Sequence, residues 1–321
     1  MATLGGLCSL CAAPPSLPSA GQLRAGTVVQ LTGDGGHYTQ PVWSPDGRWI
    51  AFARAGFGSI EIIRPDGTGR RLLVSAPRAG YRFAWSPDGE AIAFLSVVET
   101  PEGRRHRVQE IEITSGRVRT LADTADEVSW PQWEWNESGK RVVWLVFAGR
   151  EPTGWRADGS SPKPLRRPLP SGAATLTNAA VFYRDGHVWL WDAKQNAPRR
   201  LSRERGLNPV RSPDGARVVF SELNTLMVVN ADGSELRELA RGHHPAWSPD
   251  SLKLVFDVAR DDGHRITSSD LWLINADGSE LTPLTQTPDA LETEPNWSPD
   301  GRRIVYRLED KGQICVLNLE W

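Results

Sequence analysis

Histidine and carboxylate residues that could bind a metal ion stand just before three apolar segments of the chain. The candidates are His37, His243, His244 and Glu292. Neutral imidazoles and carboxylates are suitable ligands for zinc or manganese. No regular ligand spacing joins the four residues. The sequence therefore marks them as candidates for a metal site, and we predict no specific metal and no other cofactor.

Other catalytic chemistry has less support in the residue pattern. The chain contains no Gly-x-Ser-x-Gly nucleophile elbow and no glycine-rich phosphate loop that follows a strand and opens a helix. Cys8 and Cys11 form a Cys-x-x-Cys pair without a second pair to complete a zinc site. We therefore predict no catalytic residue, and the sequence favours a non-enzymatic protein while an enzyme stays open as the alternative.

The composition limits the classes of protein to consider. The 321 residues carry a formal net charge of −2, which argues against a dedicated nucleic-acid-binding domain. No apolar run reaches the roughly 18 residues that a membrane-spanning helix needs. The chain is rich in Gly, Pro and Trp, with 30, 24 and 14 residues respectively. That combination predicts many short strands joined by tight turns, with a large aromatic residue in each unit.

A pentapeptide repeat supplies these turns. Trp-Ser-Pro-Asp-Gly or a near copy occurs six times, at Trp43–Gly47, Trp85–Gly89, Trp135–Gly139, Arg211–Gly215, Trp247–Ser251 and Trp297–Gly301. Ser-Pro-Asp-Gly is a type I turn followed by a glycine that accepts a positive φ angle. An alternating strand follows each copy, and then a strand, an Asp-Gly turn and a further strand. The Trp and Asp residues of the motif are therefore interpreted as packing and turn residues.

The spacing of the motif predicts the fold. Units of about 40 residues with four strands match propeller blades. The interval between the copies at 135 and 211 is about twice the others and contains a degenerate unit near residues 179–201. We therefore predict an all-β propeller of seven four-stranded blades, forming a single domain over residues 26–321. The strand at 26–32 is expected to pair with the C-terminal blade and close the ring.

This pattern resembles the TolB-like β-propeller family, whose motif is a WD-like repeat, over residues 26–319. The family includes periplasmic TolB proteins, propellers attached to prolyl-oligopeptidase-type hydrolases, and oligogalacturonide lyases. The resemblance implies a propeller and a protein-binding or ligand-binding role in the bacterial cell envelope. The lyases imply the alternative, a metal-dependent lyase or hydrolase that acts on a carbohydrate in the channel. Neither the α/β domain of TolB nor a hydrolase domain is expected.

One position of the repeat is polar in every clear unit. It lies three residues before the motif Trp and is occupied by Gln40, Arg82, Gln132, Asn208, His244 and Glu294. Because the innermost strands of a propeller line its channel, we predict that these six residues form a polar ring at the channel mouth. The ring would bind a ligand or partner, although any solvated channel mouth is polar. Two long loops, 98–107 and 259–269, are expected on the same face.

Residues 1–25 differ from the rest and are predicted to be a leader, either an export signal or a disordered segment. Residues 3–13 are apolar, and a possible cleavage site follows Ala20, but no basic residue precedes Arg24. This favours a periplasmic or extracellular location over a cytoplasmic one. The partner is expected to be a protein or a small polar ligand, not nucleic acid, and the protein is expected to be a monomer.

Overall fold

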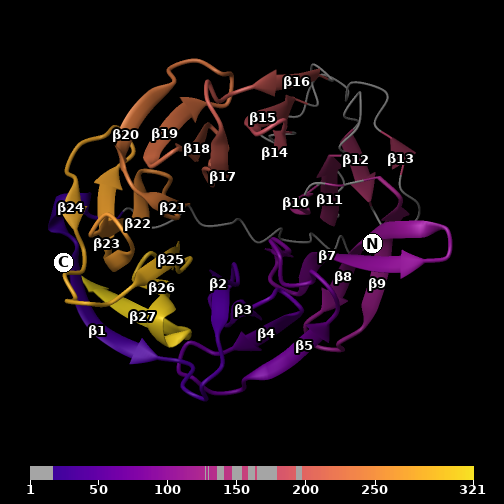
Figure 1. Cartoon of the computed structure of the whole chain (residues 1–321), viewed down its shortest axis with the longest axis horizontal. Helices are drawn as coiled ribbons and strands as arrows, with labels where there is room; N and C mark the ends of the chain where they lie inside the picture. Colours follow the sequence, from indigo (N-terminus) through magenta and orange to yellow (C-terminus); the bar gives the residue numbers. More distant parts are fainter. Residues whose placement is uncertain are drawn as a thin grey trace, which may run out of the picture.

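The chain folds into a ring of antiparallel sheets around a central channel (Figure 1). The computed structural model describes residues 17–126, 128, 130–135, 141–146, 154–157, 163–164, 179–192 and 197–321. Residues 1–16 of the predicted leader and residues 136–139 of the third motif copy lie outside these ranges. In each four-stranded sheet the strands follow one another from the channel to the rim, so the first strand of a unit is innermost.

We number the sheets in chain order. Sheet 1 contains β2 (Tyr38–Trp43), β3 (Ile50–Arg54), β4 (Ser59–Ile63) and β5 (Arg71–Ser75). Sheet 2 contains β6 (Ala84–Trp85), β7 (Ala91–Thr100), β8 (Gly103–Glu112) and β9 (Val118–Thr124). Sheet 3 contains β10 (Gln132–Trp135), β11 (Arg141–Val146), β12 (Gly154–Ala157) and β13 (Lys163–Pro164). Sheet 4 contains β14 (Ala179–Arg184), β15 (His187–Asp192) and β16 (Ala197–Arg200). Sheet 5 contains β17 (Gly206–Arg211), β18 (Arg217–Glu222), β19 (Thr225–Asn230) and β20 (Arg237–Arg241). Sheet 6 contains β21 (His243–Trp247), β22 (Lys253–Asp261), β23 (Ile266–Asn275) and β24 (Thr282–Pro283). Sheet 7 contains β25 (Glu292–Trp297), β26 (Arg303–Leu308), β27 (Gln313–Glu320) and β1 (Arg24–Gln30). Two short 3-10 helices, η1 (Ala20–Gln22) and η2 (Glu309–Lys311), complete the described elements.

The all-β propeller is confirmed, but the prediction of seven four-stranded blades is wrong. The described residues form six four-stranded sheets, and sheet 4 has only the three strands β14–β16. In the other units the motif turn joins the innermost strand to the second. Sheet 4 has no such motif, and a two-residue Asp185-Gly186 turn joins β14 directly to β15. Without the motif, no strand pairs with the inner edge of β14 within the described part of the chain.

The ring is closed by strands from opposite ends of the chain. β1 pairs antiparallel with β27, from Arg24 opposite Glu320 to Gln30 opposite Cys315. The strand that completes sheet 7 therefore comes from the start of the chain, as the sequence predicted. In this arrangement sheet 7 has no vacant outer position, and strand pairing rather than a loop holds the ring together.

The motif turns are rigid because each one satisfies its own polar groups. In the first copy the Ser44 hydroxyl donates to Asp46 (2.7 Å) and accepts the backbone N–H of Trp49 (2.9 Å). The same two contacts recur at Ser86, Ser212, Ser248 and Ser298. Ser251, which replaces the usual glycine, adopts a φ of 61°, close to the 71° of Gly47.

The motif tryptophans pack between neighbouring sheets. Trp43, Trp85, Trp247 and Trp297 are all buried. The indole N–H groups of Trp85 and Trp247 donate to the carbonyls of Val42 and Val210, each in the preceding sheet. Each of these two rings therefore fills apolar space and ties two sheets together.

A segment before β1 packs against sheets 6 and 7. We call residues 17–23 the N-terminal strap. Ala20 and Leu23 of the strap are 0% and 1% exposed and belong to the apolar core of sheets 6 and 7. The packed part of the chain thus begins upstream of the predicted boundary at residue 26, and the possible cleavage site after Ala20 lies within packed structure. No helix in the described ranges is long and apolar enough to cross a membrane.

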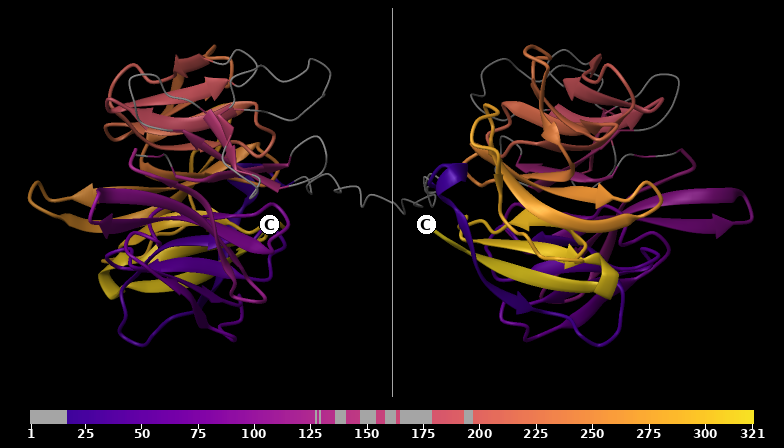
Figure 2. Two further views of the ribbon diagram at one scale, coloured as in Figure 1. Left: turned by 90° about the vertical axis from the view of Figure 1, so that its right-hand side faces the viewer. Right: turned by 60° about the vertical axis from the view of Figure 1, so that its left-hand side comes forward.

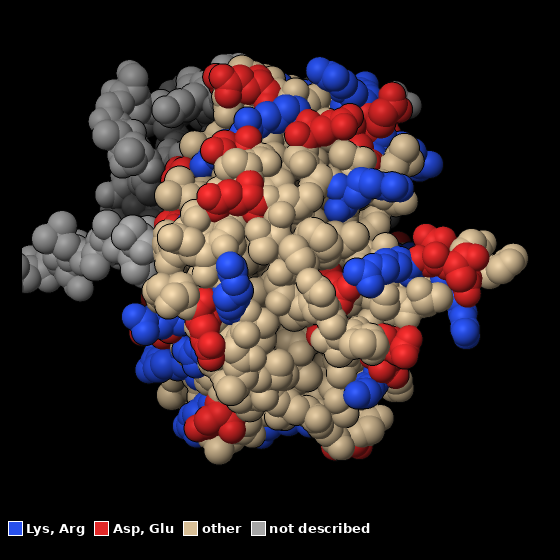
Figure 3. Space-filling view, turned by 90° about the vertical axis from the view of Figure 1, so that its left-hand side faces the viewer, with Lys and Arg blue, Asp and Glu red and all other residues tan. Residues whose placement is uncertain are grey.

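Two second-to-third-strand hairpins project from one face of the ring (Figure 2). β7 and β8 pair as far as Thr100 opposite Gly103, and β22 and β23 as far as Asp261 opposite Ile266. Both extend well past the start of their innermost strands. These are the two long loops that the sequence predicted on the face of the polar ring. Seen from the side of β1 and β24, the surface carries interspersed acidic and basic side chains (Figure 3).

Candidate functional site

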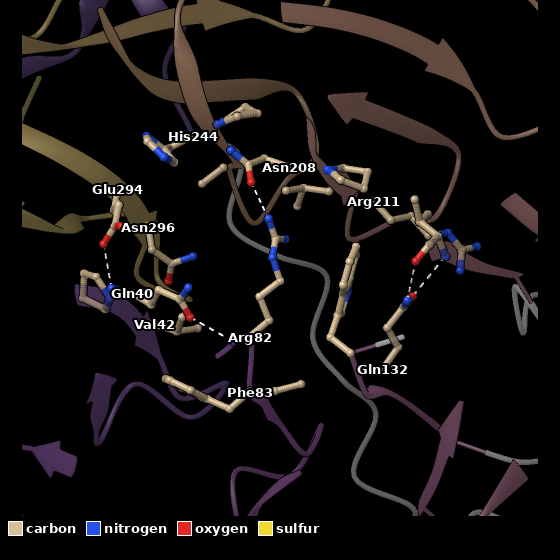
Figure 4. A pocket seen from close by; sticks show the side chains of 18 of the residues that line it. Gln40, Val42, Arg82, Phe83, Gln132, Asn208, Arg211, His244, Glu294 and Asn296 are labelled. Carbon is tan, nitrogen blue, oxygen red and sulfur yellow. Dashed lines mark hydrogen bonds between the residues drawn. The ribbon is translucent and has the colours of Figure 1, made fainter. Parts of the chain in front are cut away.

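The six predicted ring residues line one cavity of about 590 Å³ at the channel (Figure 4). Gln40, Arg82, Gln132, Asn208, His244 and Glu294 come from sheets 1, 2, 3, 5, 6 and 7. The position aligned in the sequence is therefore also one ring in space. The structure brings all six residues together, and their role in binding stays a prediction.

The ring residues share an unusual backbone conformation. Gln40, Arg82, Asn208, His244 and Glu294 have φ angles between 47° and 55°, in the left-handed region that residues with a Cβ seldom adopt. In β2, β17, β21 and β25 this residue sits at a shift of the pairing register, a β-bulge. Bulges redirect side chains and are frequent beside functional sites. Five of the six ring residues thus share this conformation, and in four sheets the same bulge aims a polar side chain into the channel.

Hydrogen bonds connect the ring from sheet to sheet. A carboxylate oxygen of Glu294 accepts the backbone N–H of Gln40 at 2.6 Å, and the Gln40 side-chain oxygen accepts the N–H of Arg82 at 2.9 Å. On the far side, the Gln132 amide donates to the carbonyl of Val181 (2.7 Å) and accepts its N–H (3.2 Å). Gln132 thus pairs with the edge of β14 that has no neighbouring strand among the described residues. The ring positions its own side chains before any ligand arrives.

Arg82 crosses the channel. Its guanidinium donates to the side-chain oxygen of Asn208, on the other side of the ring (Figure 4). The same group lies over the Trp130 ring, with its central carbon 4.6 Å from the ring centroid. Trp130 in turn contacts Tyr183 edge to face at 5.1 Å. A cation held over aromatic faces in the middle of the cavity could recognise an anionic or strongly polar group.

His244 forms an ion-pair contact at the same mouth. Its Nδ1 lies 2.8 Å from the Oδ1 atom of Asp257, a carboxylate only 3% exposed that also accepts the N–H of Glu294 at 3.2 Å. Burial alone would lower the pKa of His244, but the hydrogen bond and charge of Asp257 outweigh it and raise the pKa. Burial lowers the pKa of the neighbouring His243. The pKa values of the two neighbouring imidazoles are therefore shifted in opposite directions.

The four metal candidates do not assemble into a metal site. Within the described ranges, no group of three or more His, Cys, Asp or Glu residues is placed to hold an ion. Glu292 is 3% exposed and accepts hydrogen bonds from Thr285 and Thr287, away from the channel cavity, and its burial raises the pKa of its carboxyl group. His37 is exposed beside Gly312. Only His244 of the four lines the cavity, so these residues do not fit a manganese or zinc centre.

Apolar side chains stand beside the ring on the same face. Tyr81 and Leu207 directly precede the ring residues Arg82 and Asn208 and are 36% and 57% exposed. Leu223, in the turn between β18 and β19, is 78% exposed, and Ile266 in the long β22–β23 hairpin is 56% exposed. The polar channel mouth therefore has exposed apolar neighbours, a mixture that is frequent at interaction surfaces.

The sequence did not predict the partners that orient the ring. Asp257, Trp130 and Tyr183 lie outside the aligned position. A signal was available for Asp257, because it ends the apolar run Leu254–Phe256 and lies opposite His243 in the antiparallel register. A carboxylate at the end of a buried strand needs a partner. Trp130 and Tyr183 belong to units without a complete motif, and nothing in the sequence aligned them with the ring.

Comparisons with known proteins agree with the propeller. No family model matches the chain. A Tol-Pal system protein TolB of Gluconobacter oxydans is 45% identical over 62 residues, which are 18% of this chain and 13% of that protein. An uncharacterized protein of Agrobacterium fabrum is 31% identical over 107 residues, 32% of this chain and 36% of its own length. The chain thus spans little more than a third of these relatives at most.

Among solved structures, an oligogalacturonate lyase in complex with manganese matches with a TM-score of 0.63 over 94% of this chain and 99% of its own. The sequence identity is 14%, so this similarity shows the fold alone. The class of protein that these findings define is a β-propeller with similarity to TolB over a short stretch of the chain.

Proposed function

We propose that this propeller is a non-enzymatic binding platform of the bacterial cell envelope that takes a protein partner or a small polar ligand at its channel mouth. The observation that carries the proposal is the ring: six polar residues from six sheets line one cavity and are positioned by their own hydrogen bonds. The location rests on the similarity to TolB and on the predicted leader.

A protein partner suits the surroundings of the ring. The cavity offers the Arg82 guanidinium, the Glu294 carboxylate and amide groups, all suited to polar contacts. Leu207, Leu223 and Ile266 offer exposed apolar surface on the same face. Interfaces combine buried apolar anchors with arginine and aromatic residues, and the rim of the channel supplies both.

Affinity capture from a cell-envelope extract tests the platform. Wild-type protein is expected to retain one partner in stoichiometric amount, and the double variant Arg82→Ala/Glu294→Ala to lose at least nine-tenths of it. The matched control is Arg237→Ala/Glu238→Ala, which removes the same two charges from exposed positions on the outer strand β20. The control should retain the partner. Equal retention by both variants would refute a binding site at the ring.

The alternative function is a metal-dependent lyase or hydrolase that acts on a carbohydrate in the channel, and its metal would need ligands other than the four predicted candidates. Its support is the fold shared with the oligogalacturonate lyase and the His244–Asp257 pair at the cavity. The assay is cleavage of oligogalacturonate with and without added manganese. Manganese-dependent turnover that His244→Ala abolishes would establish the enzyme and overturn the platform.

A further inference from the structure

A second hollow lies between sheets 1 and 2, on the face opposite the polar ring. It has a volume of about 960 Å³ and is larger than the channel cavity. Its lining comes from the motif turns and from the turns between third and fourth strands, and includes Arg48, Trp49, Arg64, Gly69, Arg71 and Gly89. None of the residues that line the channel cavity lines this hollow. The hollow is therefore a separate candidate for binding.

The repeat explains why this junction is open. In sheets 5 and 7 the residue two after the motif glycine is an arginine, and it lies over the motif Trp of the next sheet. Arg217 lies 5.2 Å from the Trp247 ring centroid, and Arg303 lies 4.7 Å from that of Trp43. In sheet 1 the same position is Trp49. At the junction between sheets 1 and 2 an indole therefore replaces the covering cation.

The junction between sheets 6 and 7 shows what such a hollow can hold. There the N-terminal strap lies across the equivalent turns. The Leu17 N–H donates to Asp250 (3.3 Å), and Lys253 donates to the Leu17 carbonyl (3.3 Å). Further along, the N–H groups of Ala20 and Gly21 donate to Asn275 (3.1 Å) and Glu280 (2.9 Å). This junction therefore binds a peptide segment, supplied by the chain itself, that turns into the 3-10 helix η1 at Ala20–Gln22.

The groups that hold the strap align with the lining of the hollow. Matching turn hydrogen bonds fix the alignment: the N–H of Asn275 donates to the Ser279 carbonyl, as the N–H of Arg64 does to the Thr68 carbonyl. In the same register Lys253 corresponds to Trp49, and Glu280 corresponds to Gly69. Gly301, which packs on Leu17, corresponds to Gly89. The hollow is the counterpart of a peptide site, but without a strap of its own among the described residues.

The charge of the hollow is opposite to that of the strap site. Glu280 is replaced by glycine and Asn275 by arginine, so Arg64 and Arg71 dominate. Both guanidinium groups lie over the Trp49 ring, at 4.9 and 5.8 Å from its centroid, and Arg71 also donates to the carbonyl of Ile113. Neither forms an ion pair in the described part of the chain, while Arg48 pairs with Asp46. Two guanidinium groups on one indole suit a carboxylate.

We propose that the hollow between sheets 1 and 2 binds a short acidic peptide segment, independently of the channel. Arg64 and Arg71 would take its carboxylates, and the exposed part of the Trp49 ring would take an aliphatic side chain. Two carboxylates, Glu90 and Glu112, also line the hollow. Glu112 forms an ion pair with Arg117 at 3.0 Å, so Glu90 alone opposes the charge of Arg64 and Arg71, and the net preference is for negative charge.

The test uses a fluorescein-labelled hexapeptide of alternating Glu and Leu, with blocked ends, and measures anisotropy at low salt. The expected result is saturable binding to the full chain that the double variant Arg64→Ala/Arg71→Ala weakens at least tenfold. Arg237→Ala is the matched control, because Arg237 is the repeat counterpart of Arg71 and makes the same kind of contact, to the Ala276 carbonyl. The control should stay within twofold of wild type.

Further outcomes decide the proposal. A peptide of alternating Gln and Leu should bind at least tenfold more weakly, and Arg82→Ala in the channel should leave binding unchanged. Absence of binding to the wild type, or equal binding by the double variant at an unchanged melting temperature, would overturn the proposal. Competition by inorganic phosphate at the same concentration as the peptide would also overturn it, because the site would then recognise a simple anion.

Discussion

The pair formed by His244 and Asp257 gives a prediction that can be worked through from its geometry. We consider Asp257→Asn, which keeps the shape of the side chain and removes its charge. Asp257 is 3% exposed and its oxygen lies 2.8 Å from His244 Nδ1, so it is the main reason that the pKa of His244 is raised. Glu294 adds to this effect, whereas burial and the charge of Arg82 oppose it.

An opposite charge at this separation shifts a pKa by about 1–3 units. The His244 side chain is 41% exposed, so solvent screens part of the interaction. With the carboxylate removed, burial dominates, and the pKa of His244 should fall below its ordinary value of about 6.5. The proton affinity of the imidazole therefore drops.

The pH dependence of stability follows from the sign of the shift. A histidine whose pKa is raised in the folded state stabilises the fold fully below its unfolded pKa of about 6.5, and this contribution is lost as the pH rises through the folded value. In Asp257→Asn the contribution reverses, because a lowered pKa penalises the folded state on the acidic side. The difference in melting temperature between wild type and variant should therefore be larger at pH 6 than at pH 8.

Nuclear magnetic resonance titration of the imidazole protons measures the pKa directly, and His243→Gln assigns the two neighbouring rings. His243 itself should titrate below the ordinary histidine value, because burial lowers its pKa. A wild-type His244 pKa at or below 6.5, or one that Asp257→Asn leaves unchanged, would refute the reasoning.

Three predictions concern the scaffold. Leu23→Ala in the N-terminal strap should lower the free energy of unfolding by about 2–5 kcal/mol in a urea titration, because Leu23 is 1% exposed in the core of sheets 6 and 7. The control Leu252→Ala, at a 55% exposed position, should change it by no more than about 0.5 kcal/mol. Ser298→Ala should cost about 1–3 kcal/mol by the same titration, because it leaves a buried backbone N–H without its acceptor; a neutral result would show that water replaces the hydroxyl. Val316→Pro should lower the free energy of unfolding by about 3 kcal/mol or more and loosen the pairing of β1 with β27. The readout is faster backbone hydrogen exchange at Val28 and Val29, and unchanged exchange there would contradict closure of the ring by strand pairing.

The repeat made much of the fold predictable. The motif turns at residues 43, 85, 211, 247 and 297 satisfy their own hydrogen bonds locally, so their structure depends on few distant contacts. A fixed turn sets the register of the strands on either side. For that reason the position three residues before the motif could be placed at the channel in six sheets from the sequence alone.

What could not be predicted depends on contacts across the ring. Sheet 4 has no motif and only three strands among the described residues, and a count based on spacing took it for a complete four-stranded blade. The contact between Arg82 and Asn208 joins residues 126 positions apart in the chain, across a channel whose width the sequence does not encode. The metal candidates failed for a similar reason, because Glu292 finds its partners in the threonines of its own neighbourhood.

Closure of the ring by β1 and β27 has a consequence for biosynthesis. The Asn318 side chain bonds to Thr27, 291 residues earlier, so β1 leaves the ribosome long before its partner strand exists. At about 5–20 residues per second that interval is roughly 15 to 60 s. For that time β1 is an unpaired strand with free backbone donors and acceptors, the kind of edge that aggregates or recruits a chaperone. The last strand to be synthesised is therefore the one that ends the exposure of the first.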